Sequence, residues 1–493
     1  MRHAILVGTS QLAVLALTIV FVVFYYSADH RYPPCCDTAH TLVRAKAISM
    51  NGSTEGVLPY NPSYREPLYG SFVSEFPVHI LLSLFYQVQP DLVGDLTFAK
   101  KFFVVFFVLP AFSIYILANR LLRSSVAGVV VVLLVYFAYL FGNSYWSGHV
   151  AQILGMFLIP LYIYFIFRYE EEGRTSFLYF ALVLLLFSFW AHVLTFLILL
   201  LVAVSYAVIK IFSTSGKVKA TIAFTAFGGG AVAYFLLVPS SFLPHFATNP
   251  QYEQFGNVVA NSFGNVIFLT LLIIGCFFAI RQKRILIVWF LVTYLLTQST
   301  WLGVPFFGFR FTEFIITPVA LLAVYGMKES FTALGMRKTG SVAIAVLLII
   351  FLPFGLLQQQ HLKSCYVNNC LGLNPTQIPP DDLRAFSWIK ANLPETSVFA
   401  GPQKFGYYLP FVTDNPIEFP IIERILIFTA STAAERWRIA KDVGINYVFW
   451  DAIIDSYKNE HPDFKNYAIE PLENEQYFKK IYDEGSAKIF AVR

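Results

Sequence analysis

Charged residues are scarce in this sequence. Asp, Glu, Lys and Arg together make up 13% of its 493 residues, whereas hydrophobic residues make up 57% and the mean hydropathy is +0.61. A water-soluble protein of this length needs more charge than this to cover its surface, so the composition excludes an ordinary soluble enzyme. It indicates instead that lipid covers much of the molecule, and the aromatic content of 17% is typical of lipid-facing helices and interfacial belts.

The short motifs of several common enzyme classes are also missing. The sequence contains no GxxxxGK(S/T) loop, no GxGxxG after a strand, no HExxH, no GxSxG and no zinc-spaced CxxC pairs. No repeat of about 20 to 50 residues is apparent, which counts against an inverted-repeat transporter. The net charge of +5 is spread over small clusters, so we interpret these as signals of membrane topology and expect no nucleic-acid partner.

Cysteine is rare, with five residues in the chain. Cys276 lies inside an apolar run, where a small thiol commonly serves packing. Cys35 and Cys36 are adjacent, and Cys365 and Cys370 bracket the loop of CYVNNC. Two alternatives stay open for the last pair: a disulfide, if that segment faces an oxidising compartment, or two free thiols.

Long apolar runs dominate what is present. A membrane-spanning helix needs roughly 20 mostly apolar residues, because each residue adds about 1.5 Å. Eleven runs fit this requirement, at residues 4–26, 101–119, 125–142, 150–167, 176–191, 193–210, 220–239, 264–280, 285–302, 309–326 and 340–358. No small-residue cleavage site follows the first run, so we expect a retained anchor rather than a signal peptide. The predicted fold class is a polytopic α-helical membrane protein.

The basic residues between the spans predict sidedness. With the N-terminus inside, every predicted inner connection is basic, and the outer turns hold no Lys or Arg except Arg310 at a helix mouth. The inner basic residues are Arg120, Arg123, Arg168, Arg174, Lys210, Lys217, Lys219, Arg281, Lys283, Arg284, Lys328, Arg337 and Lys338. An odd number of spans then places the C-terminal region outside. We therefore expect a multi-pass protein of the cell membrane with a cytoplasmic N-terminus.

Two segments fall outside these spans. In the outer loop of about residues 27–98, the pattern of residues 37–50 indicates a helix on the membrane surface, and residues 77–86 fit an interfacial or re-entrant helix. Beyond residue 358, helical patterns alternate with short strand patterns; the helices are at 381–392 and 432–442, and the strands at 397–400, 446–450 and 488–492. This alternation predicts a small extracytoplasmic α/β domain at 359–493, after a transmembrane domain at 1–358.

Ionisable residues in or near the spans are few, and most map to the outer face. They are Asp37, His40, Glu66, Glu75, His149, His192, Arg310 and Glu313. Ionisable groups in membrane segments are candidates for function, and polar groups that converge at one face of an apolar bundle resemble a binding site. The two histidines each begin or join predicted spans, where a lone histidine is commonly an interfacial residue.

Asp37 ends the run YPPCCD and begins the predicted surface helix. A carboxylate at the bilayer edge can act as a general base or hold a divalent cation such as Mg²⁺ or Mn²⁺. Asp is also a preferred N-cap residue, so a helix cap is the alternative, and the two roles are compatible. His40 is three residues further on and faces the same side, where such a pair binds metal or is simply solvated.

Arg310 stands among aromatic residues at the start of a span. Its planar guanidinium suits a phosphate group, including that of a lipid. The alternatives are an intrahelical pair with Glu313, one turn further along, or snorkelling to the interface. Lys100 and Lys101 allow the same two interpretations: a phosphate-attracting pair, or the interfacial start of a span.

The order of these motifs resembles the GT-C superfamily of membrane glycosyltransferases, which use polyprenyl-phosphate sugar donors. Asp37 in CCDTAHTLVRAKAI is similar to the family's outer-loop aspartate, and YREPLYGSFVSEFPVHILLSLF to the segment that follows it. GHVAQILGMFLIPLYIY and AHVLTFL resemble the span at the second outer motif and a histidine-containing turn of archaeal-type relatives. In the C-terminal part, WIKANLPETSVFAGPQKFGYYLPFVTDNPIEF and ERWRIAKDVGINYVFW resemble the outer domain of oligosaccharyltransferases. The resemblance thus covers nearly the whole chain.

Three departures narrow this resemblance. Where oligosaccharyltransferases carry WWDYG, this chain reads PQKFG at residues 402–406. The second acidic motif, aspartate–any–histidine in some archaeal members, is here Ser147-Gly148-His149, so only the histidine matches. The link before the span of Arg310 is very short. These departures argue against a peptide oligosaccharyltransferase and favour a monosaccharide-transferring relative, or one that has lost activity.

The resemblance implies a glycosyltransferase with Asp37 as base or cation ligand, His149 as a second metal ligand, and Arg310 near the donor phosphate. His40, Glu66, His149, His192 and Glu313 are the secondary candidates. The charge on the leaving phosphate needs a cation or an arginine, and the sequence leaves both open. The acceptor is a protein glycan, a lipid or a surface polymer. The alternative function is a non-catalytic membrane protein, such as a transporter or a surface-polymer assembly factor.

Overall fold

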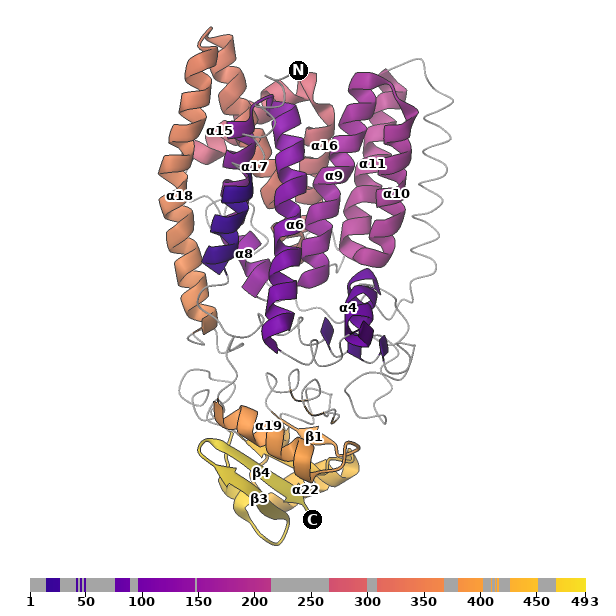
Figure 1. The fold of residues 1–493 in the computed structure, drawn as a ribbon, viewed down its shortest axis with the longest axis vertical. Coiled ribbons are helices and arrows are strands. Elements are labelled where there is room, and N and C mark those ends of the chain that lie inside the picture. The colour runs from indigo at the N-terminus through magenta and orange to yellow at the C-terminus, as the bar shows by residue number, and fades with distance from the viewer. Residues whose placement is uncertain are drawn as a thin grey trace.

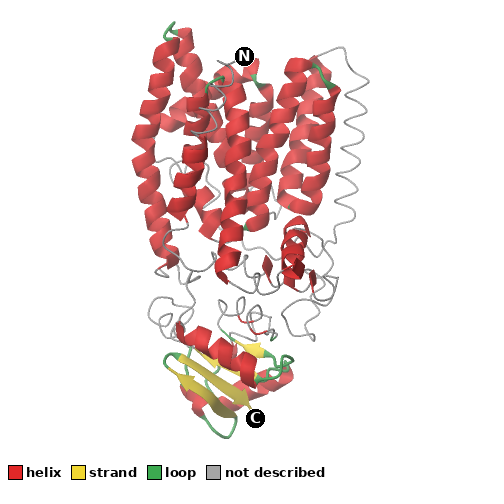
Figure 2. Cartoon of the chain, in the orientation of Figure 1, coloured by secondary structure: helices red, strands yellow, loops and turns green. Residues whose placement is uncertain are grey.

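A computed structural model shows a bundle of long helices with a small sheet-containing unit at one end (Figure 1). It describes residues 15–26, 76–88, 96–146, 149–213, 266–298, 308–367, 380–401, 426–450 and 467–493, with isolated positions between 41 and 49 and at 409, 413 and 415. Helix dominates this part of the chain, and the strands are confined to its C-terminal end (Figure 2). The fold is thus mostly helical, as predicted.

Most of the long helices lie along the long axis of the bundle, and successive ones run in opposite directions (Figure 1). After a helix at Leu15–Tyr26, the first group comprises α4 (Phe76–Val88), α6 (Leu96–Leu122), α7 (Ser125–Tyr136), α8 (Tyr139–Trp146), α9 (Val150–Glu172), α10 (Thr175–Ala191) and α11 (Val193–Ser213). The second group comprises α15 (Val266–Gln282), α16 (Arg284–Thr297), α17 (Gly308–Ala333) and α18 (Arg337–Val367).

Helices occupy the predicted spans wherever the structure describes them, with one break at 125–142; residues 4–14 and 220–239 lie outside the described residues. By length and composition, five helices in the described part of the chain can cross a membrane: Lys100–Leu122, Val150–Glu172, Val193–Lys210, Arg310–Ala333 and Val342–Gln360. Several other helices are apolar but shorter, so the total of eleven spans stays a prediction. The predicted interfacial segment at 77–86 is helix α4.

One predicted span is broken. The sequence predicts a continuous helix over 125–142, but the structure divides this region into α7 and α8 at Phe137 and Ala138. Backbone carbonyls next to the break accept hydrogen bonds from side chains of other helices. The Tyr26 hydroxyl donates to the carbonyl of Tyr136 (2.5 Å), and Gln359 Nε2 donates to the carbonyl of Ala138 (2.7 Å). Such partners are what a helix break at membrane depth requires.

Helix α17 lies at the centre of the bundle. It packs most closely against α15, where two glycines bring the backbones together. A Cβ added to Gly275 would lie 1.9 Å from the carbonyl oxygen of Leu322, so no larger residue fits there without moving a helix. Helix α10, by contrast, lies at the edge of the bundle and exposes large apolar side chains such as Phe180 and Trp190, which suits contact with lipid.

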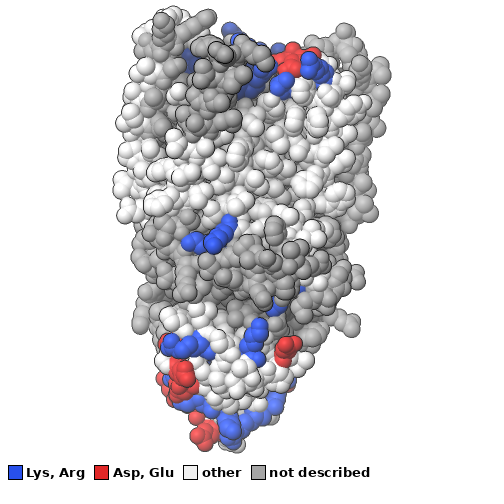
Figure 3. Space-filling model, in the orientation of Figure 1, with Lys and Arg blue, Asp and Glu red and all other residues white. Residues whose placement is uncertain are grey.

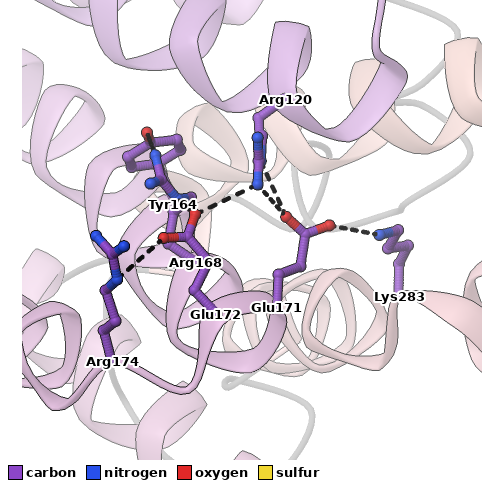
Figure 4. Close-up of polar contacts among 7 residues, drawn as sticks. All are labelled: Arg120, Tyr164, Arg168, Glu171, Glu172, Arg174 and Lys283. Carbon is purple, nitrogen blue, oxygen red and sulfur yellow. Dashed lines mark hydrogen bonds and ion pairs between the residues drawn. The ribbon is translucent and has the colours of Figure 1, made fainter.

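Ion pairs join several helices at one end of the bundle. Figure 3 shows acidic and basic side chains side by side at the end of the bundle away from the sheet-containing unit. The C-terminal turn of α9 carries Glu170, Glu171 and Glu172, and Figure 4 shows the contacts of the last two. Glu171 binds Arg120 of α6 at 2.7 Å and approaches Lys283, between α15 and α16, at 3.8 Å, and Glu170 binds Lys210 of α11 at 2.5 Å. Basic residues from separate predicted inner connections therefore meet at the same end, as the charge pattern predicts. The structure contains no membrane, so which side this end faces stays a prediction.

The C-terminal residues form a four-stranded sheet of order β1-β2-β4-β3. Strand β1 (Phe399–Ala400) pairs in parallel with β2 (Tyr447–Trp450), while β4 (Ala487–Val492) is antiparallel to both β2 and β3 (Phe478–Glu484). Helices α19 (Pro380–Asn392) and α22 (Ala433–Asp442) and the 3-10 turn η3 (Glu470–Glu473) complete this unit. The two helices and strands β1, β2 and β4 lie where the sequence predicts them, and β3 is an additional strand.

Candidate functional site

Six of the predicted site residues are described: Lys100, Lys101, His149, His192, Arg310 and Glu313. The predictions for Asp37, His40, Glu66 and Glu75 fall outside the described residues. So does Cys370, and with it the prediction of a disulfide to Cys365, which belongs to α18.

The site is built where several helices begin or turn. His149 is the N-cap residue of α9, Arg310 and Glu313 occupy the first turns of α17, and His192 joins α10 to α11. All lie at the end of the bundle opposite the ion pairs of Glu171, because α9 carries His149 at one end and Glu171 at the other. The sheet-containing unit is drawn at this same end (Figure 1).

Glu313 is the centre of the cluster. Its side chain is only 3% exposed, and its carboxylate accepts three hydrogen bonds from neutral side chains of other helices. Asn143 Nδ2 donates to Oε1 (3.1 Å), the Ser144 hydroxyl donates to Oε2, and Gln152 Nε2 also donates to Oε2 (2.5 Å). Nδ1 of His149 lies 3.5 Å from the same Oε2. A buried carboxylate persists only with such partners.

The broken span supplies two of these donors. Asn143 and Ser144 belong to α8, the short helix after the break, so the break directs both toward α17. Gly142 lies directly against Gln359, and a Cβ at this position would lie 2.0 Å from the amide oxygen of Gln359. The same amide binds the carbonyl at the break (2.7 Å). The position of α8, and so of the donors to Glu313, is thus fixed by α18.

The guanidinium of Arg310 contacts a neutral amide. Arg310 Nη1 approaches the amide oxygen of Gln152 at 3.5 Å, and Gln152 Nε2 approaches the main-chain carbonyl of Arg310 at 3.3 Å. The sequence leaves open an intrahelical pair of Arg310 with Glu313 or snorkelling to the interface. The structure instead places Gln152 of α9 against both residues. Arg310 is half-buried, at the mouth of the bundle.

His192 has a structural role that the sequence does not show. Its Nδ1 lies 3.0 Å from the Thr195 hydroxyl and accepts a hydrogen bond from the Thr195 backbone N–H (3.4 Å), which caps the start of α11. Its ring also lies against Phe314 of α17, with centroids 5.9 Å apart. His192 is therefore next to the Glu313 cluster, and its described contacts orient a helix terminus.

The two lysines stand at the start of α6, with Lys100 half-buried and Lys101 exposed. Whether these two lysines attract a phosphate group stays a prediction.

The fit of a divalent cation can be tested only in part. His149 and Glu313 bring one imidazole and one carboxylate together, and no group of three or more His, Cys, Asp or Glu side chains with metal-binding geometry occurs among the described residues. A divalent cation takes more ligands than these two groups supply. The other predicted ligand, Asp37, is outside the described residues, so we derive no reaction step from a metal.

Sequence reasoning missed the neutral members of the cluster: Asn143, Ser144 and Gln152. A signal for them exists, since the stretch GNSYWSGHVAQ interrupts two strongly apolar runs with polar residues. Its amides and hydroxyls are not ionisable, and such groups are common at helix ends, so the sequence alone does not distinguish them.

The fold is similar to solved structures of membrane glycosyltransferases. An oligosaccharyltransferase of Archaeoglobus fulgidus in the apo form has 12% identity and a TM-score of 0.58, covering 98% of this chain and 74% of that one. ArnT from Cupriavidus metallidurans, bound to undecaprenyl phosphate, has 10% identity and a TM-score of 0.57, covering 98% of both chains. The arabinofuranosyltransferase AftD from Mycobacteria has 14% identity and a TM-score of 0.59, covering 98% of this chain and 40% of AftD.

No protein-family model matches the sequence, and no curated protein matches it. The three enzymes are GT-C glycosyltransferases, so the resemblance seen in the sequence is confirmed at the level of the fold. At identities of 10 to 14%, the likeness concerns the fold.

Proposed function

We propose that this protein is a membrane glycosyltransferase that transfers a sugar from a polyprenyl-phosphate-linked donor to an extracytoplasmic acceptor. The observation that carries the proposal is the position of Arg310. Its half-buried guanidinium stands at the mouth of an apolar bundle, beside a buried polar cluster, in a fold shared with an enzyme solved with undecaprenyl phosphate. A lipid phosphate that stays in the bilayer needs a cationic partner at this depth.

The reaction needs two contributions from the protein: stabilisation of the charge on the leaving phosphate, and a general base. An acceptor hydroxyl attacks the anomeric carbon of the sugar, and the bond from this carbon to the donor phosphate oxygen breaks. The leaving polyprenyl phosphate takes the electron pair, and the charge that develops on it is stabilised by the Arg310 guanidinium. The proton of the acceptor hydroxyl goes to a general base, for which Asp37 is the candidate. If a divalent cation binds, Asp37 and His149 are the residues that would hold it, and it would supply further positive charge near the phosphate.

The topology belongs to this proposal. Eleven spans with a cytoplasmic N-terminus place the start of α9, the start of α17 and the residues from 359 onward on the outer side. The C-terminal α/β unit then covers the site and contacts the acceptor, which is a protein glycan, a lipid or a surface polymer. Lys100 and Lys101, at the start of α6, attract the phosphate from the same side.

Binding of the donor lipid tests the phosphate role. Wild type and Arg310→Ala are purified in nanodiscs, and the dissociation constant for added undecaprenyl phosphate is measured beside the mass spectrum of co-purified lipids. Loss of a charged hydrogen-bond partner predicts at least about tenfold weaker binding. Arg174→Ala is the matched control, since Arg174 is 71% exposed at the start of α10, at the opposite end of the bundle. Equal binding by Arg310→Ala and wild type would exclude this phosphate site.

Transfer itself tests the enzyme against the non-catalytic alternative. A mixture of polyprenyl-phosphate sugars and candidate acceptors is incubated with wild type and with Asp37→Asn, and released polyprenyl phosphate is measured. A glycosyltransferase releases it, and the variant does so at least about a hundredfold more slowly, the usual scale of general base catalysis. If wild type binds the donor and releases no polyprenyl phosphate with any acceptor, the protein is better explained as a non-catalytic transporter or assembly factor.

A further inference from the structure

Gln152 connects the two charged residues of the cluster. It is 2% exposed and lies one turn inside α9 from His149. Its Nε2 donates to Glu313 Oε2 at 2.5 Å, and its Oε1 faces Arg310 Nη1 at 3.5 Å. One carboxamide therefore contacts a carboxylate on one side and a guanidinium on the other.

The orientation of this amide is determined by Glu313. A carboxylate only accepts hydrogen bonds, so it selects the NH₂ group of the amide and turns the carbonyl oxygen toward Arg310. The reversed amide would place oxygen against carboxylate and NH₂ against guanidinium, which is unfavourable at both contacts. Gln152 thus presents an acceptor to Arg310 because Glu313 holds its donor.

Glu313 is contacted from several helices. Asn143 and Ser144 of α8 donate to its carboxylate, His149 Nδ1 lies 3.5 Å from Oε2, and Glu313, Ser144 and His149 are buried within the bundle. Its position is set by α8, α9 and α17 together. A fixed carboxylate, an amide oriented by it and a guanidinium next to that amide form a chain of contacts that ends at the mouth of the bundle.

We propose that Gln152 is a positioning residue of the donor site, which holds the Arg310 guanidinium in place for the phosphate of the lipid-linked donor. This inference rests on the proposed function, since it concerns how Arg310 meets that phosphate. Gln152 acts through Arg310 and needs no contact with the donor. Pre-organisation of a cation at its binding geometry removes an ordering cost from ligand binding.

A double-mutant cycle isolates this role. Full-length wild type, Gln152→Leu, Arg310→Ala and the double variant are placed in phosphatidylcholine nanodiscs, and the dissociation constant for undecaprenyl phosphate is measured. We expect Gln152→Leu to weaken binding about tenfold in the wild-type background, and to change it less than twofold in the Arg310→Ala background. A merely structural role lowers affinity by the same factor in both backgrounds, and that result overturns the proposal.

Two further variants are controls, one for impaired folding and one for the specificity of the effect. Gln152→Leu leaves the buried Glu313 carboxylate with one donor fewer and can impair folding. Gln152→Leu/Glu313→Gln removes the buried charge as well and keeps an amide oxygen that can accept from Ser144, which costs less stability. We expect this folded variant to bind undecaprenyl phosphate about tenfold more weakly as well. Gln282→Leu is the matched control, because Gln282 makes the same kind of side-chain contact, with Tyr325 (2.8 Å), at the opposite end of the bundle. It should bind like the wild type.

The source of the phosphate is tested with competitors. Inorganic phosphate and phosphatidylglycerol are each added at the concentration that undecaprenyl phosphate needs for saturation. Displacement by inorganic phosphate alone would show a site for free phosphate, and displacement by phosphatidylglycerol one for any anionic headgroup; either overturns the assignment to the lipid-linked donor. If wild type binds undecaprenyl phosphate and Arg310→Ala does not, while Gln152→Leu binds like wild type, only the positioning role fails. If wild type itself does not bind, the proposed function fails with it.

Discussion

Replacing Glu313 tests whether the buried cluster depends on its acceptor or on its charge. Glu313→Leu removes the acceptor of three neutral donors, of which Ser144 and Gln152 are buried and Asn143 is half-buried. An unsatisfied buried donor costs about 1 to 3 kcal/mol, so the lower bound for the two buried donors is about 2 kcal/mol. We therefore expect Glu313→Leu to lower the unfolding free energy by about 2 kcal/mol or more.

Glu313→Gln should be much milder. The amide oxygen can take the place of Oε2 and accept from Ser144 and Gln152, and Asn143 can turn its own amide to meet the new NH₂ group. The loss of charge assistance is offset by the lower desolvation cost of a neutral group. The expected loss is about 1 kcal/mol.

The assay is an SDS titration of unfolding in mixed micelles, followed by tryptophan fluorescence. Glu329→Leu and Glu329→Gln are the matched controls, because Glu329 lies at the other end of α17 and pairs with Lys328 at 3.6 Å. The reasoning is refuted if Glu313→Leu is as stable as wild type. It is also refuted if Glu313→Gln is as unstable as Glu313→Leu, since the charge and not the hydrogen bonds would then hold the cluster.

Three further changes probe other parts of the fold. Gly275→Val forces α15 away from α17 and should lower the unfolding free energy by about 2 to 3 kcal/mol in the same titration. A variant as stable as wild type would contradict the close packing of the two helices. Arg436→Met leaves the carbonyls of residues 428, 430 and 468 without their guanidinium donor. The rate of amide hydrogen exchange in the sheet unit should therefore rise at least about tenfold. Replacement of the exposed Arg438 by Met is the control and should leave this rate unchanged. The Ser486 backbone N–H and hydroxyl lower the pKa of Asp381, so this carboxylate stabilises the fold at neutral pH. That contribution is lost as the pH falls below the ordinary aspartate range and through the lowered pKa. Protection of the Ser486 amide, corrected for intrinsic exchange, should fall over that range in the wild type and not in Asp381→Asn, and equal profiles would refute the link.

Hydropathy and charge were sufficient to predict where the helices run. An apolar run of this length has few alternatives in lipid, because its backbone must bond internally. The basic connections predicted a common end, and the pairs of Glu171 with Arg120 and Lys283 place them there. Strand β3 escaped prediction because FKKIYDE is largely polar, as expected of a strand at the edge of the sheet.

The break between α7 and α8 could not be predicted from local sequence. No proline or glycine marks it, and the residues around Phe137 are strongly apolar. The side chains that bind the backbone there are remote in sequence: the hydroxyl of Tyr26 donates to the carbonyl of Tyr136, and the amide of Gln359 donates to the carbonyl of Ala138. A side chain more than 200 positions away has no signature in the run that it breaks.

The same limit applies to the candidate site. The ionisable residues of the sequence identify Arg310, Glu313 and His149 as separate candidates, and the structure brings them together. What organises them is neutral: an amide on α9 and an amide and a hydroxyl on α8. Such groups are numerous in any sequence, and only their placement around one buried carboxylate distinguishes these.

The two ends of α9 explain why this site can be rigid. At one end Glu170, Glu171 and Glu172 tie the helix to α6, to α11 and to the turn between α15 and α16. At the other end Gln152 and its neighbour His149 tie it to α17. A helix held at both ends can neither tilt nor slide without breaking contacts at one of them. Helices α9 and α17 therefore form one wall of the candidate site, and under the proposed function a lipid-linked donor would meet an arginine that Gln152 already positions.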